Sequence, residues 1–272
     1  MKTTHIKLGL LGCGKMGTAL VKGISSVHNK DIEYYYFDVI ETSMNAMAEL
    51  LSDCVAKAVD SAELLWQFCD IIILAVKPKD ITSVLISTSH LPQKPLLISL
   101  IVGLSHDKLT RLSNNTRCVC VMPNTPALVG EGVFAIEDKR STSAESKLDY
   151  EAAEKLLNTC GRCYYLETQE QMNAAVALSG SSPAFFAVIV EALVDAGVAE
   201  GLPRDLALAL ARDTMRGTAK LLQINSPMKI KADVMSPAGT TAAGIIALER
   251  AGLVKAVLEY TLAVTEKSRS IF

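Results

Sequence analysis

The sequence predicts an α/β protein with an N-terminal doubly wound domain followed by an all-α C-terminal domain. Short apolar runs alternate with amphipathic stretches over about the first 165 residues, whereas the remainder is rich in Ala and Leu and has helical periodicity. A glycine-rich turn directly after the first apolar run is a further indication of a nucleotide-binding α/β domain. We place the boundary where the pattern changes, giving domains 1–167 and 168–272.

Six strands are expected in the first domain, because six short runs are continuously apolar, as is typical of parallel strands covered on both faces. They span residues 6–11, 33–37, 71–76, 95–100, 117–122 and 132–136. Helical stretches lie between most of them, and right-handed crossovers then produce a doubly wound sheet. Its ligand is expected at the carboxyl ends of the strands.

The turn after the first strand has the pattern Gly-x-Gly-x-x-Gly. Gly12 permits a tight turn, Gly14 lets the backbone approach a pyrophosphate, and Gly17 lets the following helix pack closely on the strand. Free amides at the helix start attract the phosphates. The pattern therefore predicts a Rossmann dinucleotide site for NADPH or NADH, the alternative being a turn that serves packing alone. The expected cofactor contacts in this turn are Gly12, Cys13, Gly14, Lys15, Met16 and Gly17.

Asp38 closes the second expected strand, about twenty residues after the glycine turn. An acidic group at this point accepts hydrogen bonds from the 2′-hydroxyl of an adenosine ribose and repels a 2′-phosphate, which favours NADH. Asp and the nearby hydroxyl residues are also helix-capping residues, so a purely structural role is the alternative.

Two loops follow other strands and are expected to line the nucleotide crevice, because such loops lie at the carboxyl edge of the sheet. Two proline-stiffened turns without a ligand are the alternative. The expected cofactor-site residues are Ala75, Val76, Lys77 and Pro78 in the first loop and Pro123 and Asn124 in the second.

Composition excludes several function classes. The chain has 272 residues, is 50% hydrophobic and carries a formal net charge of −2, with no basic stripe, so a nucleic-acid partner is not expected. The N-terminal stretch before the glycine turn is too short for a signal peptide, and no apolar run is expected to reach the ~20 residues of a membrane helix. A cytoplasmic location without a membrane partner follows as an expectation.

The seven cysteines do not indicate a metal site. Cys118 and Cys120 lie on one face of an expected buried strand, where a thiol behaves as a small apolar group. Nothing brings this pair together with Cys160 and Cys163 into a tetrahedral zinc site, and an odd number of cysteines argues against a disulfide framework. We expect no metal.

Six segments, in this order and at these separations, resemble pyrroline-5-carboxylate reductases: "GCGKMG", "AVKP", "MPNTPALVGEG", "LSGSSPAFF", "EALVDAGVAEGLPR" and "DVMSPAGTTAAGIIALE". The resemblance spans nearly the whole chain. It implies reduction of the cyclic imine Δ1-pyrroline-5-carboxylate to L-proline by NAD(P)H, the last step of proline biosynthesis. It also implies a Rossmann domain followed by a helical dimerisation domain, with interleaved helices.

The second glycine-containing turn, "SPAGTT", is interpreted as the site of a substrate that carries a carboxylate beside a cyclic imine. A helix expected from about Thr240 presents free amides to the carboxylate. Carried over from the family, the substrate contacts are Ser236, Gly239, Thr240 and Thr241, and the Thr241 hydroxyl lies beside the imine nitrogen as the catalytic group. Simple helix capping is the alternative.

Other readings remain open at this stage. A 3-hydroxyacid dehydrogenase is disfavoured because no Lys lies on the first long helix of the second domain, between residues 169 and 197, where its acid/base is often found. A reductase of another cyclic imine and a non-catalytic dinucleotide sensor are further alternatives. The chain also departs from the family at Ala238, where Gly is frequent, at Ile224, where an acid is frequent, and at Asp38; the role of Asp233 is left open.

The long apolar segment that begins near Ser182 and Pro183 predicts a homo-oligomer built on a dimer. Its apolar side chains point in nearly every direction around a helix that ends near Gly201. About one hundred residues offer too few helices to enclose it, so a partner chain is expected to complete the core. Shorter C-terminal helices folding back over the same chain are the alternative.

Overall fold

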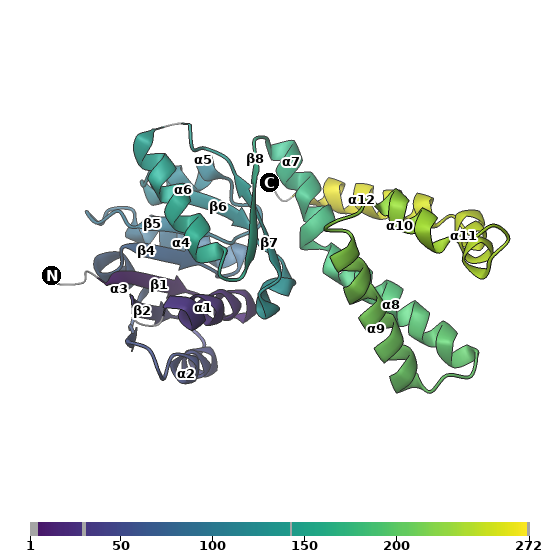
Figure 1. Cartoon of the computed structure of the whole chain (residues 1–272). Coiled ribbons are helices and arrows are strands. Elements are labelled where there is room, and N and C mark those ends of the chain that lie inside the picture. The colour runs from purple at the N-terminus through teal and green to yellow at the C-terminus, as the bar shows by residue number, and fades with distance from the viewer. Residues whose placement is uncertain (1–4, 29–30, 142, 271–272) are drawn as a thin grey trace. The chain divides into compact units, whose positions relative to one another are not determined.

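The computed structural model describes residues 5–28, 31–141 and 143–270 and divides into two compact units (Figure 1). The nucleotide unit comprises residues 1–180 and 264–272, and the helical unit comprises residues 181–263. Residues 168–180 belong to the nucleotide unit, unlike in the expected division after residue 167, because Met172 packs with Met122 and Ala135 of the sheet.

The nucleotide unit is built on a sheet of eight strands in the order β3-β2-β1-β4-β5-β6-β7-β8. All six expected strands are confirmed, with ends that differ by at most two residues from those expected. Two strands were not expected: β3 is only three residues long and exposed, and β8 has the alternating exposure of an edge strand. The strands are β1 Ile6–Leu11, β2 Ile32–Phe37, β3 Ala56–Ala58, β4 Ile71–Leu74, β5 Leu96–Ser99, β6 Cys118–Met122, β7 Gly132–Glu137 and β8 Gly161–Leu166.

One strand pair departs from the expected parallel arrangement. β6 and β7 are antiparallel, with Val121 opposite Ile136, whereas the other pairs described are parallel. The connection consists of the 3₁₀ helix η1 Thr125–Val129 and a few flanking residues. It is too short for a parallel crossover, which needs a dozen or more residues.

Helices cover both faces of this sheet, as a doubly wound fold requires. One core cluster joins α1, α2 and α6 to one face, and a second joins α3, α4 and α5 to the other. α7 and the π-helical turn η2 follow β8. The helices are α1 Lys15–His28, α2 Glu41–Leu50, α3 Ala62–Phe68, α4 Pro78–Thr88, α5 His106–Ser113, α6 Ala144–Leu157, α7 Gln169–Ala175 and η2 Val176–Gly180.

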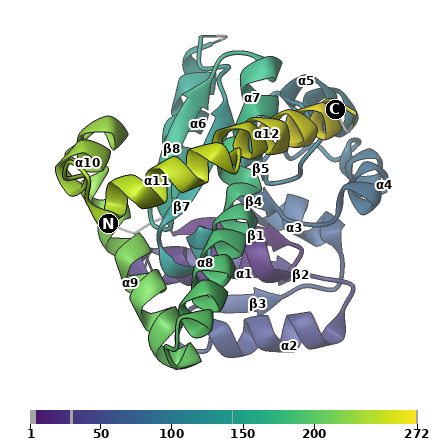
Figure 2. The same ribbon diagram turned by 90° about the vertical axis from the view of Figure 1, so that its right-hand side faces the viewer.

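The helical unit contains the expected long helix and its neighbours. α8 Ser182–Ala199 begins with Pro183 in its first turn and is followed by Gly201 at a φ of 96°, which confirms the predicted start and end. α8 and α9 run side by side as a helical pair (Figure 2). The remaining helices are α9 Arg204–Leu221, α10 Pro227–Val234, α11 Thr240–Arg250 and α12 Leu253–Arg269, whose last residues from Val264 belong to the nucleotide unit.

The expectation that no apolar run reaches the length of a membrane span is wrong by length and composition. α7, η2 and α8 form one helix of 31 residues, Gln169–Ala199, in which 11% of the most apolar window is buried. Ser and Gly residues around position 180 interrupt the apolar run in the sequence but leave the helix continuous. A helix with this composition also suits burial against another protein chain.

Candidate active site

The glycine turn between β1 and α1 is closely packed at two of its three glycines. Gly12 has a φ of 99°, and a β-carbon there would lie 2.7 Å from the carbonyl carbon of Ala75. A β-carbon at Gly17 would collide with the carbonyl oxygen of Gly12. By contrast, a β-carbon at Gly14 would meet no atom within 4 Å. The turn is therefore open where a pyrophosphate would approach, and the residues present fit a dinucleotide.

α1 presents its first amides directly after this open position. The amide of Thr18 is the first to be bonded within the helix, to Gly14 O at 2.9 Å, and its hydroxyl donates to Cys13 O at 3.1 Å. The preceding helix amides have no intrahelical acceptor and are suited to an anion. Burial, with a smaller effect from the Asp38 carboxylate, raises the pKa of the Cys13 thiol to about 12, so this residue contributes its backbone and a neutral side chain.

Asp38 bonds to the glycine turn as well as to its own loop. Its Oδ2 accepts the backbone N–H of Cys13 at 2.7 Å, and its Oδ1 accepts that of Ile40 at 2.9 Å. Asp38 is not the N-cap of α2, because that helix begins at Glu41 with Ile40 as its N-cap. A carboxylate has about four acceptor positions, so both oxygens retain capacity for a ribose hydroxyl.

The loop after β4 lies beside the glycine turn. The amide of Ala75 donates to Leu11 O at 2.8 Å, which extends the pairing of β1 and β4 by one residue. Val76 is half-buried, Lys77 is the N-cap of α4, and Pro78 occupies its first turn. A cavity of about 90 Å³ adjoins this end of α4, lined by Pro78, Ile81, Thr82, Ile101, Val102, Gly103, Leu104 and Lys108.

In the loop after β6, Pro123 is half-buried and Asn124 is buried. The Asn124 side chain bonds at both ends to the protein backbone. Its Oδ1 accepts from Val133 N at 2.8 Å, and its Nδ2 donates to Ser179 O at 3.2 Å. Asn124 therefore ties three segments together, a function that the sequence pattern did not indicate.

The turn 236–241 lies in the helical unit, and α11 begins at Thr240 as expected. The N-cap is Gly239, whose amide donates to Ser236 O at 3.0 Å. No side-chain capping bond is present at this helix start, and in the part of the chain that the structure describes neither threonine hydroxyl has a hydrogen-bond partner. The geometry thus argues against threonine capping and leaves the Thr241 hydroxyl and the first amides of α11 for a ligand.

Two departures from the family pattern, Ala238 and Ile224, lie in the helical unit, as does Asp233, whose role the sequence leaves open. Ala238 has a φ of 56°, a left-handed conformation that glycine adopts more easily. Ile224 is 79% exposed, and Asp233 forms an exposed ion pair with Lys229 at 2.8 Å. Asp233 is thus occupied by a partner on its own helix.

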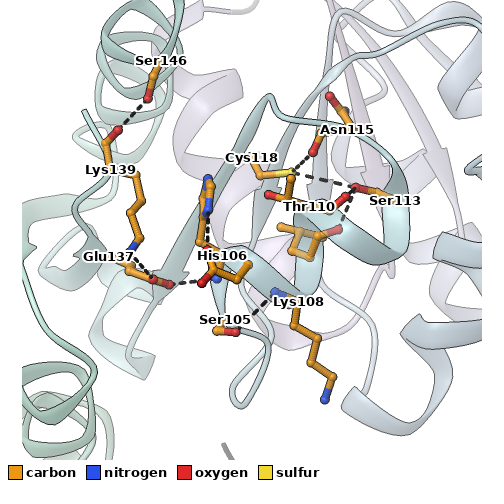
Figure 3. Close-up of polar contacts among 12 residues, drawn as sticks. Ser105, His106, Lys108, Thr110, Ser113, Asn115, Cys118, Glu137, Lys139 and Ser146 are labelled. Carbon is orange, nitrogen blue, oxygen red and sulfur yellow. Dashed lines mark hydrogen bonds and ion pairs between the residues drawn. The ribbon is translucent and has the colours of Figure 1, made fainter. Parts of the chain in front are cut away.

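Figure 3 shows polar contacts around α5, among them those of the Cys118 thiol. The buried Cys118 thiol donates to Asn115 O at 3.2 Å, and the His106 amide donates to the Glu137 carboxylate at 2.9 Å (Figure 3). Burial raises the pKa of Cys118 to about 12. The seven cysteines are free, and within residues 5–28, 31–141 and 143–270 no group of three or more potential ligands is arranged for a metal ion.

Comparisons with known proteins cover both units. A family model described as pyrroline-5-carboxylate reductase dimerisation matches residues 169–271, and one described as NADP oxidoreductase coenzyme F420-dependent matches residues 7–103. The pyrroline-5-carboxylate reductase of Aquifex aeolicus is 34% identical over 270 residues, covering 98% of this chain and 97% of that protein. The crystal structure of Plasmodium falciparum pyrroline carboxylate reductase with NADP bound has a TM-score of 0.80 at 32% identity, covering 98% of each chain. A pyrroline-5-carboxylate reductase structure from Coxiella burnetii has a TM-score of 0.85 at 25% identity, covering 97% of each chain.

Proposed function

This chain belongs to the pyrroline-5-carboxylate reductase family, and we propose from this premise that it reduces Δ1-pyrroline-5-carboxylate to L-proline with NAD(P)H, the last step of proline biosynthesis. The observation that carries the proposal is the full-length match to a curated reductase, at 34% identity over 98% of the chain. The match includes both the glycine turn at 12–17 and the turn at 236–241, so it extends well beyond a shared Rossmann fold.

The proposed chemistry needs little acid/base help from the protein. An imine carbon accepts hydride readily once its nitrogen is protonated, and this protonation occurs in solution near neutral pH. The reduced nicotinamide supplies the hydride when it is bound. Consistent with this, the segment 169–203 contains no Lys that could serve as the acid/base of a hydroxyacid dehydrogenase.

The start of α11 is the proposed substrate site. The free amides of Thr240 and Thr241, with Ser236 and Gly239 beside them in the turn, contact the substrate carboxylate. The helix dipole stabilises this carboxylate by roughly 0.3 to 2 kcal/mol. The Thr241 hydroxyl orients the imine nitrogen. Support comes from its lack of a structural partner within the described residues and from Gly239, rather than a threonine, serving as the N-cap.

The proposed cofactor site combines the glycine turn 12–17 with the loops 75–78 and 123–124. Gly14, with no atom near its missing β-carbon, marks where the pyrophosphate approaches. Asp38 gives the site a negative charge beside the expected adenosine ribose, and we infer that NADH competes well with NADPH for this reason. Asn124 contributes through its backbone and by shaping the loop, since its side chain is already bonded at both ends.

The proposed assembly is a homo-oligomer built on a dimer, located in the cytoplasm. α8 and α9 carry a large apolar surface that this chain leaves open: Phe186 is 50% exposed, Leu193 55% and Leu210 52%. These side chains line a groove of about 760 Å³ within the helical unit. A second copy of the chain is the occupant that the family model for dimerisation supports, since its residues 169–271 include both helices.

The test is imine-dependent loss of NADH or NADPH absorbance with Δ1-pyrroline-5-carboxylate and purified protein. We expect turnover with at least one cofactor. A six-membered cyclic imine carboxylate and a pyrroline without the carboxylate serve as comparison substrates, and both are expected to react more slowly. The larger ring adds one methylene, a difference typically worth 10–200-fold, and the pyrroline without the carboxylate lacks the group that the start of α11 is proposed to hold. Absence of imine-dependent oxidation with both cofactors contradicts the proposal, and faster turnover of the six-membered ring reassigns the substrate.

A further inference from the structure

The two ends of the Asn124 side chain connect segments that are 9 and 55 residues away in the sequence. The Asn124 side chain is buried, with 6% of its surface exposed. Its carboxamide oxygen accepts a hydrogen bond from the amide of Val133 at the start of β7, and its nitrogen donates one to the carbonyl of Ser179 in the π-helical turn. A buried carboxamide that is satisfied at both ends fixes the relative position of the segments it joins. The bond to Ser179 is unusual, because a carbonyl within a helix normally accepts a hydrogen bond from a backbone amide of the same helix.

Pro183 explains why this carbonyl is available. In a regular helix the Ser179 carbonyl receives the amide of residue 183, but proline has no N–H. The next amide, of Ala184, donates to Ser181 O at 3.1 Å. A carbonyl without a donor is costly in this partly buried position, and the side-chain amide of Asn124 donates to it at 3.2 Å in place of the missing N–H.

We propose that Asn124 is a positioning residue for the reductase. Its side-chain amide replaces the N–H that Pro183 lacks and so holds the turn 176–180 against the loop after β6. π-helical turns are frequent at functional sites, and this one is bonded to a loop at the carboxyl edge of β6, where a doubly wound sheet binds its ligand. A shift there moves cofactor-side groups out of place, and small misplacements can lower rates strongly.

The loop is also tied to the helix that follows the glycine turn. Ala127, three residues after Asn124, is 3% exposed and belongs to the same core cluster as Leu20 and Ile24 of α1. The Asn124 bonds therefore connect the turn 176–180 to the packing under the dinucleotide site. Because the kinetic consequence rests on the proposed function, the test below also includes a measurement that does not depend on activity.

A double-mutant cycle isolates the bond to Ser179, because Pro183→Ala restores an N–H that can reach the same carbonyl. We expect Asn124→Ala to lower kcat about 10-fold while the KM for the cofactor changes less than about 2-fold. In the Pro183→Ala background, Asn124→Ala should lower kcat by no more than about 3-fold. Equal losses in the two backgrounds would show that Asn124 acts through Val133 alone and would overturn the proposal.

Hydrogen exchange provides the second measurement. The amides of residues 181, 182 and 184–187 should exchange about 10-fold faster in Asn124→Ala than in the parent protein, and most of this difference should disappear in the double variant. Unchanged exchange in Asn124→Ala contradicts the proposal whether or not the protein turns over the imine. If Asn124→Ala does not fold, Asn124→Asp replaces it, since the carboxylate keeps the acceptor for Val133 and loses the donor to Ser179.

Discussion

The carboxylate of Asp38 accepts the backbone N–H of Cys13, with an Oδ2 to N distance of 2.7 Å. One side chain thus links the end of β2 to the second residue of the glycine turn. In the proposed site this carboxylate both supports the turn and carries the charge that discriminates between a ribose hydroxyl and a 2′-phosphate. These two roles can be separated by mutation.

Asp38→Ser should shift the ratio of kcat/KM for NADH to that for NADPH about 10-fold towards NADPH, because the charge that repels a 2′-phosphate is removed. Asp38→Asn is the matched control: it also removes the charge but retains an acceptor for the Cys13 amide. We expect Asp38→Asn to shift the ratio as much as Asp38→Ser does, but to lose less affinity for both cofactors than Asp38→Ser. An unchanged ratio in both variants would leave Asp38 with the structural role alone.

Thr241→Ala should lower kcat/KM for the imine by about one to two powers of ten, the order expected when one positioned hydrogen bond to a charged or developing group is lost. The melting temperature should stay close to that of the parent, because the hydroxyl has no partner within the described residues and Gly239 is the N-cap. Thr241→Ser, which keeps the hydroxyl, is expected to retain most activity. Parental kinetics in Thr241→Ala would remove the residue from the proposed mechanism.

Ala238→Gly should stabilise the protein by roughly 0.5 to 1 kcal/mol in urea unfolding. The left-handed φ of 56° costs an L-residue roughly 1–2 kcal/mol, and glycine removes this strain. Glycine also raises the entropy of the unfolded chain, which offsets part of the stabilisation. Ala243→Gly, in the exposed part of α11, is the control and should destabilise by about 1 kcal/mol. A destabilised Ala238→Gly protein would contradict the strain argument.

Alkaline pH should weaken the fold. Burial raises the pKa of the Cys118 thiol from 9.0 to about 12, so the folded state favours the neutral thiol. The stabilisation is complete below pH 9 and is lost progressively as the pH rises towards 12, by about 1 kcal/mol at pH 10. Urea unfolding from pH 7 to 10 should show a shallower decline in Cys118→Ala than in the parent. Identical slopes would argue against a buried neutral thiol at this position.

The sequence predicted the parts of the fold that depend on local patterns. Continuous apolar runs located six strands, and Pro183 with Gly201 located the ends of α8. The three-residue β3 and the edge strand β8 have no such run, because an exposed or half-exposed strand does not need one. The direction of β7 depends on the length of its connection to β6, which the apolar pattern does not encode.

The candidate site was predictable where spacing determines chemistry and unpredictable where tertiary contacts do. The pattern 12–17 and the start of α11 at Thr240 follow from the residues themselves. The bond of Asp38 to Cys13 and that of Asn124 to Ser179 join segments far apart in the sequence. Proline at position 183, four residues after Ser179, is the one local signal that could have indicated a missing helix donor there.

The apolar surface of α8 and α9 leads to the last prediction, on assembly. Leu210 lines the groove of the helical unit and is 52% exposed in the single chain, whereas Leu148, on α6 of the nucleotide unit, is 65% exposed outside that groove. Because a charge is costly to bury in an apolar interface, Leu210→Glu should shift the mass measured by light scattering from dimer or larger to monomer. Leu148→Glu introduces the same charge on another surface and should leave the mass unchanged.

Activity should follow the mass, because the proposed enzyme is an obligate oligomer. Dilution of the parent protein should lower specific activity over the same concentration range in which it dissociates, and Leu210→Glu should move this range to higher concentration. A fully active parent with a monomeric mass at working concentration contradicts the argument. Equal effects of Leu210→Glu and Leu148→Glu on mass and activity would show that the added charge is the cause, rather than loss of a buried apolar contact. The groove between α8 and α9 would then not be the interface.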